Sequence, residues 1–397
     1  MPMIKVFIQR LNPNGSLSLL LIGLIGTIGL YSLMILPILV GAYIDYLGFD
    51  EDTAGWVSAI NLAGVAIITL IVSLKTKRWP LHKVASIGLA LMLVFDVLSL
   101  FFHDLTIFAA LRFCSGMAGG AAMAAAGAAI ARLKHSEKGY GIYIGCQFLF
   151  PAIAMYFLAQ SLPSIEFNGM MQIIIGLELL ALIATPIFIN YPLPAVNSEL
   201  DTLETKLIFQ RPALLSLLGL CVYGAATAAI WAYADRIGID ASLSVKASGN
   251  IIAIITGISV LGAILVIYLK DRFGYIKPLS AGLILQIIGL LILMNIHTPI
   301  GYTIGIGTFS IAWAFCWPYF LSIQADLDQT GTVVVAGQFT NLLGNATGPA
   351  IAAFLVGGGL YSPAIWMACG LTALSLLIML LIPSAKQTSF ASNYRPL

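Results

Sequence analysis

The chain has 397 residues, of which 60% are hydrophobic and 9% charged, and its formal net charge is +2. A typical soluble domain is about one quarter charged, so this composition excludes a water-covered protein and predicts an integral membrane protein. The small net charge gives no basis for nucleic-acid binding.

The cysteines and histidines do not predict a metal site or a disulfide framework. All five cysteines lie inside apolar runs, where they are expected to pack as small hydrophobes. The four histidines lie at the ends of these runs or in short loops. No nucleotide-binding loop of the G-x-x-x-x-G-K-[ST] type is present, so neither a cofactor nor ATP as the energy source is predicted.

Twelve apolar runs are long enough to cross a membrane as helices, which needs about 20 residues each. They are continuous, unlike the short alternating segments of a membrane barrel. The predicted fold is therefore an all-α membrane protein with 12 transmembrane helices. The runs cover residues 16–41, 53–74, 83–102, 105–131, 139–162, 168–190, 212–236, 246–269, 277–296, 299–325, 331–357 and 361–383.

Basic residues predict the orientation, because they favour cytoplasmic loops. With both termini in the cytoplasm, all but three of the 19 basic residues lie inside. Arg236 and Lys246 then lie outside and Arg112 lies within the membrane. The first run is too long for a cleavable signal, so we expect a multi-pass protein, as in a bacterial cytoplasmic membrane. The longest loop, 191–211, predicts a cytoplasmic linker between six-helix halves at 1–190 and 212–397.

The two halves contain a weak internal repeat. The sequence "PAIA" occurs at 151–154 and again at 349–352, and "NLAGVAIITLIVSLKTKRWPL" (61–81) aligns without gaps with "SVLGAILVIYLKDRFGYIKPL" (259–279). Both matches have an offset of 198 residues. Further upstream, "AYIDYLGFD" (42–50) matches "AYADRIGID" (232–240) at an offset of 190.

Two six-helix halves related by a parallel repeat resemble the major facilitator superfamily. This resemblance implies a secondary transporter that works by alternating access. The stretch Asp271-Arg272-Phe273-Gly274 looks like the loop motif of that family, which implies a cytoplasmic latch formed by Asp271, Arg272 and Gly274. The aligned residues of the first half, 73–76, contain no acidic residue, which departs from the family pattern. An interfacial pair without a latch function is the alternative.

Two further stretches bear on the subfamily. "LRFCSGMAGGAA", beginning at Leu111, is similar to the arginine-glycine motif in span 4 of proton-linked members, which implies a role for Arg112 in proton transfer. The glycine-rich motif of antiporters is missing from span 5, which has only Phe150-Pro151. This departure argues against a standard drug exporter.

Three charged residues are predicted at membrane depth, where a charge costs at least a few kcal/mol, so they are candidates for proton coupling. Asp96 and Arg112 each lie about 10 Å below the outer boundary, at 1.5 Å per residue, and could pair. An unpaired Arg112 would instead attract an anionic substrate in the central cavity, or extend its side chain to the headgroups. Glu178 lies near the midplane of span 6, where it serves coupling or is a neutral structural acid.

Two further sets of residues are candidates for gating and substrate binding. Asp45 and Asp235 match in the repeat and lie at outer span ends, where they form an extracellular gate or simply solvated turns. Amides and aromatics inside the spans should face the bundle interior. Trp231 and the nearby Tyr233 could alternatively belong to an interfacial aromatic belt. The predicted substrate-binding residues are Arg112, Tyr31, Asn61, Tyr143, Gln147, Trp231, Trp313, Trp317, Gln338 and Asn341.

The sequence thus predicts a secondary active transporter for a small organic solute, with proton coupling and no cofactor. Its expected partners are the solute, protons and the lipid bilayer, and we expect a monomer that binds no nucleic acid. An efflux antiporter, an uncoupled facilitator and an organic-anion importer are alternatives. An intramembrane enzyme is disfavoured because no paired catalytic groups lie at one depth, and a receptor is disfavoured because no soluble output domain is present.

Overall fold

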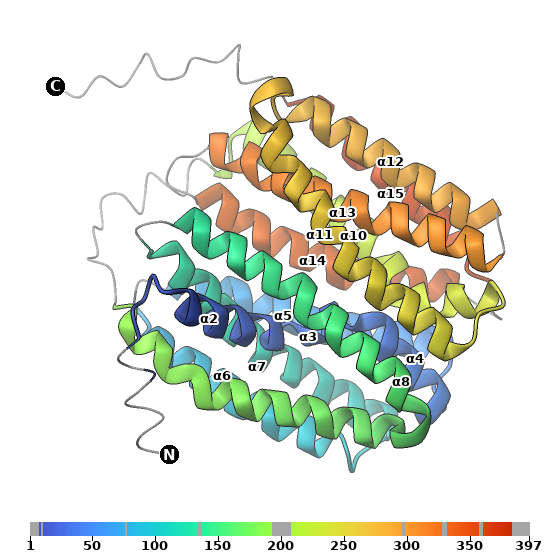
Figure 1. Ribbon diagram of the computed structural model, residues 1–397, viewed down its shortest axis with the longest axis horizontal. Helices are drawn as coiled ribbons and strands as arrows, with labels where there is room; N and C mark the ends of the chain where they lie inside the picture. Colours follow the sequence, from blue (N-terminus) through green and yellow to red (C-terminus); the bar gives the residue numbers. More distant parts are fainter. Residues whose placement is uncertain are drawn as a thin grey trace.

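The computed structural model describes residues 8, 11–75, 78–133, 136–192, 208–295, 298–327, 332–356 and 360–382. These residues form a bundle of helices (Figure 1). The first half contains α2 (Ser16–Gly29), α3 (Tyr31–Met34), α4 (Leu36–Leu47), α5 (Glu51–Lys75), α6 (Leu81–Leu98), α7 (Leu105–Ala131), α8 (Ser136–Ala184) and the 3-10 helix η1 (Thr185–Asn190). The second half contains α10 (Arg211–Asp240), α11 (Val245–Phe273), α12 (Ile276–Asn295), α13 (Pro299–Leu327), α14 (Thr332–Leu355) and α15 (Ser362–Leu380).

The predicted twelve-span architecture is confirmed, although several boundaries differ. Nine of the described helices are long and apolar enough to cross a membrane. The fifth and sixth predicted spans run together as α8, in which the helical backbone is interrupted only at Glu166 (φ 55°, ψ −166°). The first predicted span is divided into α2, α3 and α4, and α14 supplies the eleventh. The break at Glu166 falls between the predicted fifth and sixth spans, which end at 162 and begin at 168, and it is shorter than the predicted interval.

The helices pack as two groups that follow chain order, α2–α8 and α10–α15 (Figure 1). In the first group α7 packs against α5 and α6, and α2 packs against α8. In the second group α10 packs against α14 and α15, and α13 against α11 and α12. The most extensive contacts between the groups join α5 with α14, α8 with α11, and α4 with α10.

Equivalent glycines allow close helix packing inside each of the two halves. A Cβ atom on Gly64 of α5 would collide with the carbonyl oxygen of Phe113 on α7. A Cβ on Gly262 of α11 would collide with the carbonyl oxygen of Ile311 on α13. Both glycines and both partners are separated by the 198-residue offset of the repeat. Glycine is needed at these positions because only its missing side chain lets two helix backbones approach so closely.

The two ends of the bundle are named by residues that lie there. The Gly48 end contains the connections at 48–50, 101–104 and 241–244, where Gly48 ends α4 in the left-handed conformation (φ 70°). The Arg132 end lies opposite, where α7 stops. There Arg132 donates to the carbonyl oxygens of Tyr191 at 3.0 Å and Pro192 at 3.1 Å, which holds α7 to the segment after η1.

Candidate functional site

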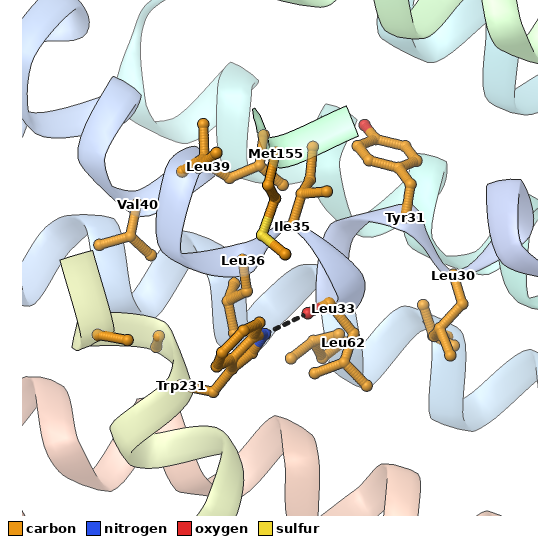
Figure 2. Close-up of a cluster of buried hydrophobic side chains, with 14 of the residues drawn as sticks. Leu30, Tyr31, Leu33, Ile35, Leu36, Leu39, Val40, Leu62, Met155 and Trp231 are labelled. Atoms are coloured by element: carbon orange, nitrogen blue, oxygen red, sulfur yellow. Dashed lines mark hydrogen bonds between the residues drawn. The ribbon is translucent and has the colours of Figure 1, made fainter. Parts of the chain in front are cut away.

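The first span is broken on either side of α3. Leu30 (φ −117°, ψ 18°) separates α2 from α3, and Ile35 (φ −108°, ψ 22°) separates α3 from α4. Pro37, in the first turn of α4, has no N–H, so it cannot donate to the Leu33 carbonyl as the residue four positions later does in a continuous helix. That oxygen accepts a backbone N–H in the turn that ends α3 and, in addition, a hydrogen bond from the indole Nε1 of Trp231 on α10, at 2.9 Å (Figure 2).

The same four-residue helix carries Tyr31, which points away from Trp231 into the first half (Figure 2). Its hydroxyl donates to Asp96 Oδ2 of α6 at 2.6 Å and accepts from Arg112 Nη1 of α7 at 3.0 Å. Arg112 Nη2 reaches Asp96 Oδ1 at 2.5 Å and Ser99 Oγ at 2.8 Å. The guanidinium also lies over the ring of Phe108, 5.6 Å from its centroid.

This ion pair is completely enclosed by protein. The exposed fraction is 0% for Asp96 and 1% for Arg112. The structure therefore decides between the three environments considered for Arg112: it pairs with Asp96, and it does not extend to the headgroups. Arg112 also does not face an open cavity. The residues that its guanidinium contacts, Asp96, Tyr31 and Ser99, all belong to the first half.

Glu178 of α8 brings a second carboxyl group to the pair. It is fully buried, and no described donor reaches either of its oxygens. The charged groups that act on it electrostatically are Asp96 and Arg112. One guanidinium balances one carboxylate, so a second buried negative charge at this place would be uncompensated and costly. A proton shared between Asp96 and Glu178 removes that cost, which makes the Tyr31–Asp96–Arg112–Glu178 cluster chemically suited to bind and release one proton.

The second half contains no counterpart of this cluster. The 198-residue offset of the repeat places Ser310 at the position of Arg112, Met294 at that of Asp96 and Leu376 at that of Glu178. Ser310 is buried, and its hydroxyl has no hydrogen-bond partner among the described residues. The second half therefore has no charged residue at these three aligned positions.

The remaining predicted binding residues fall into two groups. Asn61 donates to the Arg112 carbonyl oxygen at 2.6 Å, so it joins α5 to α7. Tyr143 of α8 lies so close to α2 that a Cβ on Gly26 would collide with its ring. The other members are half-buried and make no hydrogen bond within the described part of the chain, so their polar atoms remain available. These members are Gln147, Gln338, Asn341, Trp313 and Trp317.

Trp231 and Tyr233 lie between the halves rather than in an interfacial belt, so the belt interpretation is wrong. Their exposed fractions are 3% and 1%. The Trp231 ring packs edge-on against Trp313 of α13, with centroids 5.7 Å apart. The Tyr233 hydroxyl donates to the Glu51 carbonyl oxygen at 2.9 Å. Burial is the reason for the difference, since both rings pack against the other half instead of facing headgroups.

At the Gly48 end, Arg236 joins the two halves. Its guanidinium donates to both Asp45 oxygens, at 2.9 and 2.6 Å, and to Asp235 Oδ2 at 3.3 Å. Asp235 is buried, so its alternative as a solvated turn residue is wrong. Arg236 was not predicted as a site residue. The sequence does contain one sign of its importance. Arg236 is one of the two basic residues placed outside, although basic residues favour the cytoplasmic side.

Other contacts between the halves accompany this arginine. Tyr361, which precedes α15, donates to the Glu51 carboxylate, and Gln160 of α8 donates to Asn250 of α11 at 2.8 Å. Trp56 packs edge-on against Phe354. The described hydrogen bonds that cross between the halves all lie in the part of the bundle toward the Gly48 end.

The predicted cytoplasmic latch is only partly described. The backbone of α11 continues through Asp271 and Arg272, and Gly274 ends the helix with φ 67°. The side chains of Asp271 and Arg272 lie outside the described part of the structure. Their pairing stays a prediction.

Comparisons with known proteins agree with this architecture. The sequence profile described as Major Facilitator Superfamily matches residues 19–341. No curated protein sequence matches the chain. The chain is similar in structure to the nucleoside transporter NupG, with a TM-score of 0.73 and 12% identity over 93% of this chain and 99% of that one. It is also similar to a D-xylose-proton symporter, with a TM-score of 0.75 and 17% identity over 94% of this chain and 98% of that one. Since the family profile covers most of its length, the chain belongs to the Major Facilitator Superfamily and is an integral, multi-pass membrane transporter.

Proposed function

We propose that this transporter couples the movement of an uncharged, polar organic solute to the movement of a proton. The buried Tyr31–Asp96–Arg112–Glu178 cluster carries the proposal, because it places two carboxyl groups around one guanidinium inside the membrane. With Glu178 neutral, Asp96 is the single carboxylate of the cluster, and it is paired with Arg112 and accepts from Tyr31. Loss of the proton leaves two carboxylates to share one arginine, which changes the contacts that hold α3, α6 and α7 together.

The charge inventory supports an uncharged solute. Among the described residues, Arg112 is the one basic side chain placed far from both ends of the bundle, and Asp96, Ser99 and Tyr31 already occupy it. An organic anion would therefore find no free cation there. The half-buried amides and the indoles of Trp313 and Trp317 offer hydrogen bonds and stacking surfaces instead. Two structural neighbours are titled a nucleoside transporter and a D-xylose-proton symporter, and nucleosides and xylose are uncharged polar solutes.

The distribution of contacts supports a state that is closed at the Gly48 end. We place that end outside the cell and both termini in the cytoplasm, following the basic residues. The two six-helix halves, 1–190 and 212–397, then rock about the linker, and closure at the Gly48 end corresponds to the inward-facing state of this cycle. In this cycle Arg236, Asp45 and Asp235 form the outer gate, and the Asp271–Arg272 pair is the inner latch.

Replacing Arg236 by glutamine should open the outer gate. The change removes both charged bonds to Asp45 and leaves two carboxylates facing each other. Because Asp45 is partly exposed, we expect a modest shift of about tenfold toward the outward-open state. Spin labels at Phe101 and Ile300, which are exposed at the Gly48 end of each half, should report longer distances. Lys246→Gln is the control, because it removes an exposed charge at the same end, and an equal shift in both variants would contradict the gate.

An uptake panel tests the proposed function directly. Purified protein in proteoliposomes should accumulate radiolabelled uridine or D-xylose against its gradient when the lumen is alkaline, and should not accumulate lactate. Collapse of the pH gradient should stop accumulation while exchange of labelled for unlabelled solute continues. Accumulation of lactate alone would contradict the assignment of an uncharged solute. Accumulation that persists without any proton gradient would contradict proton coupling.

A further inference from the structure

Trp231 of α10 contacts one helix of each half: α3 of the first and α13 of the second. Its N–H bonds to the Leu33 carbonyl oxygen of α3, in the first half. Its ring packs against Trp313, which is half-buried on α13 of the second half. Leu36 and Leu62 of the first half lie near the indole in this buried cluster (Figure 2). The residue is therefore a fixed contact between the two halves, at the depth where the first span is broken.

The acceptor of this bond lies on α3, a helix of four residues between Leu30 and Ile35. Pro37 cannot make the regular helical bond to Leu33, so the Leu33 carbonyl accepts a backbone N–H in a tighter turn and a second hydrogen bond from a side chain of the opposite half. On its other side α3 is held by the Tyr31 hydroxyl, which bonds to both Asp96 and Arg112. A change of charge in the cluster therefore moves the Leu33 carbonyl, because Tyr31 and Leu33 lie on the same four-residue helix.

The charged and titratable groups around Asp96 come from several helices. Arg112 of α7, Tyr31 of α3 and Glu178 of α8 face it, and Tyr43 of α4 lies beside Arg112. The His103 ring lies farther away, 6.5 Å from that of Phe108. Of these groups, Tyr31 is the one that lies on the same short helix as Leu33.

We infer that Trp231 is a positioning residue that couples the protonation of the cluster to the relative position of the two halves. The inference rests on the proposed proton site and adds the path by which that site acts on the second half. When the cluster changes its charge, Tyr31 moves α3, and α3 carries Trp231 and α10 with it through the Leu33 carbonyl. In the other direction, a solute that stacks on Trp313 shifts Trp231 and so reaches the cluster.

Hydrogen–deuterium exchange of the full chain in lipid nanodiscs tests this path without a solute. Exchange is followed over a pH series and corrected for the intrinsic pH dependence of amide exchange. In the unmodified protein, peptides covering 30–37 and 232–243 should change protection at the same pH. In Trp231→Phe, which keeps a ring but lacks the N–H, the 30–37 peptide should still respond. The response of the 232–243 peptide should fall by about tenfold, the equilibrium effect of one hydrogen bond.

Two variants separate this path from a general loss of packing. Pro37→Ala adds a backbone N–H on α4 that can compete with Trp231 for the Leu33 carbonyl, so Trp231→Phe should have a smaller effect in that background. Trp366→Phe removes an exposed indole on α15 and should leave both responses unchanged. An unaltered pH response of 232–243 in Trp231→Phe would overturn the inference while leaving the proton site intact. The absence of any pH response in the unmodified protein would overturn the proton site and the inference together.

Discussion

Replacing Arg112 by methionine is expected to destabilise the protein more than any other single change in the bundle. Methionine fills a similar volume but leaves Asp96 and Glu178 buried without a positive charge, and it removes a donor to Tyr31 and another to Ser99. Breaking a buried pair by removing one partner costs about 3–5 kcal/mol. Thermal unfolding in detergent measures this loss as a lower melting temperature.

Two companion variants make the result specific to the cluster. Asp96→Asn combined with Arg112→Met removes the uncompensated charge and should recover part of the lost melting temperature. Arg211→Met makes the same substitution at an exposed position at the start of α10 and should change stability little. If Arg112→Met melted at the same temperature as Arg211→Met, the ion pair would not stabilise the fold.

The sequence predicted the architecture because its two signals are local and strong. The apolar runs need only their own length to identify spans, and the repeat needs only matched order along the chain. The structure reflects that repeat, since Gly64 and Gly262, 198 residues apart, make equivalent close helix contacts in their own halves. The depth of Asp96 and Arg112 could likewise be computed from residue counts, since both lie on regular helices.

The rest of the candidate site depends on contacts that residue counts do not contain. Glu178 was expected near the midplane, but its approach to Asp96 depends on the packing of α8 against α6. The break of the first span was missed because Pro37 near the end of a long apolar run permits either a kink or a new helix. Arg236 was missed because its partner Asp45 is 191 residues away, in the other half.

Glu178→Gln is expected to separate solute movement from proton movement. Glutamine has the shape of a protonated glutamate and carries no charge, so the Asp96–Arg112 pair keeps its geometry. The position can no longer release a proton, so the cluster stays in one charge state through the cycle. Exchange of solute across the membrane should therefore continue, while accumulation driven by a pH gradient should be lost. Glu166→Gln, on the exposed bend of the same helix, is the matched control and should behave as the unmodified protein does.

The most direct measurement is the proton flux that accompanies solute entry, read with a pH-sensitive dye inside proteoliposomes. Addition of the solute selected by the uptake panel should acidify the lumen with the unmodified protein and with Glu166→Gln. With Glu178→Gln the solute should equilibrate without any change in lumen pH. Proton entry in Glu178→Gln at the same ratio to solute as in the unmodified protein would contradict the assignment of this cluster as the proton site.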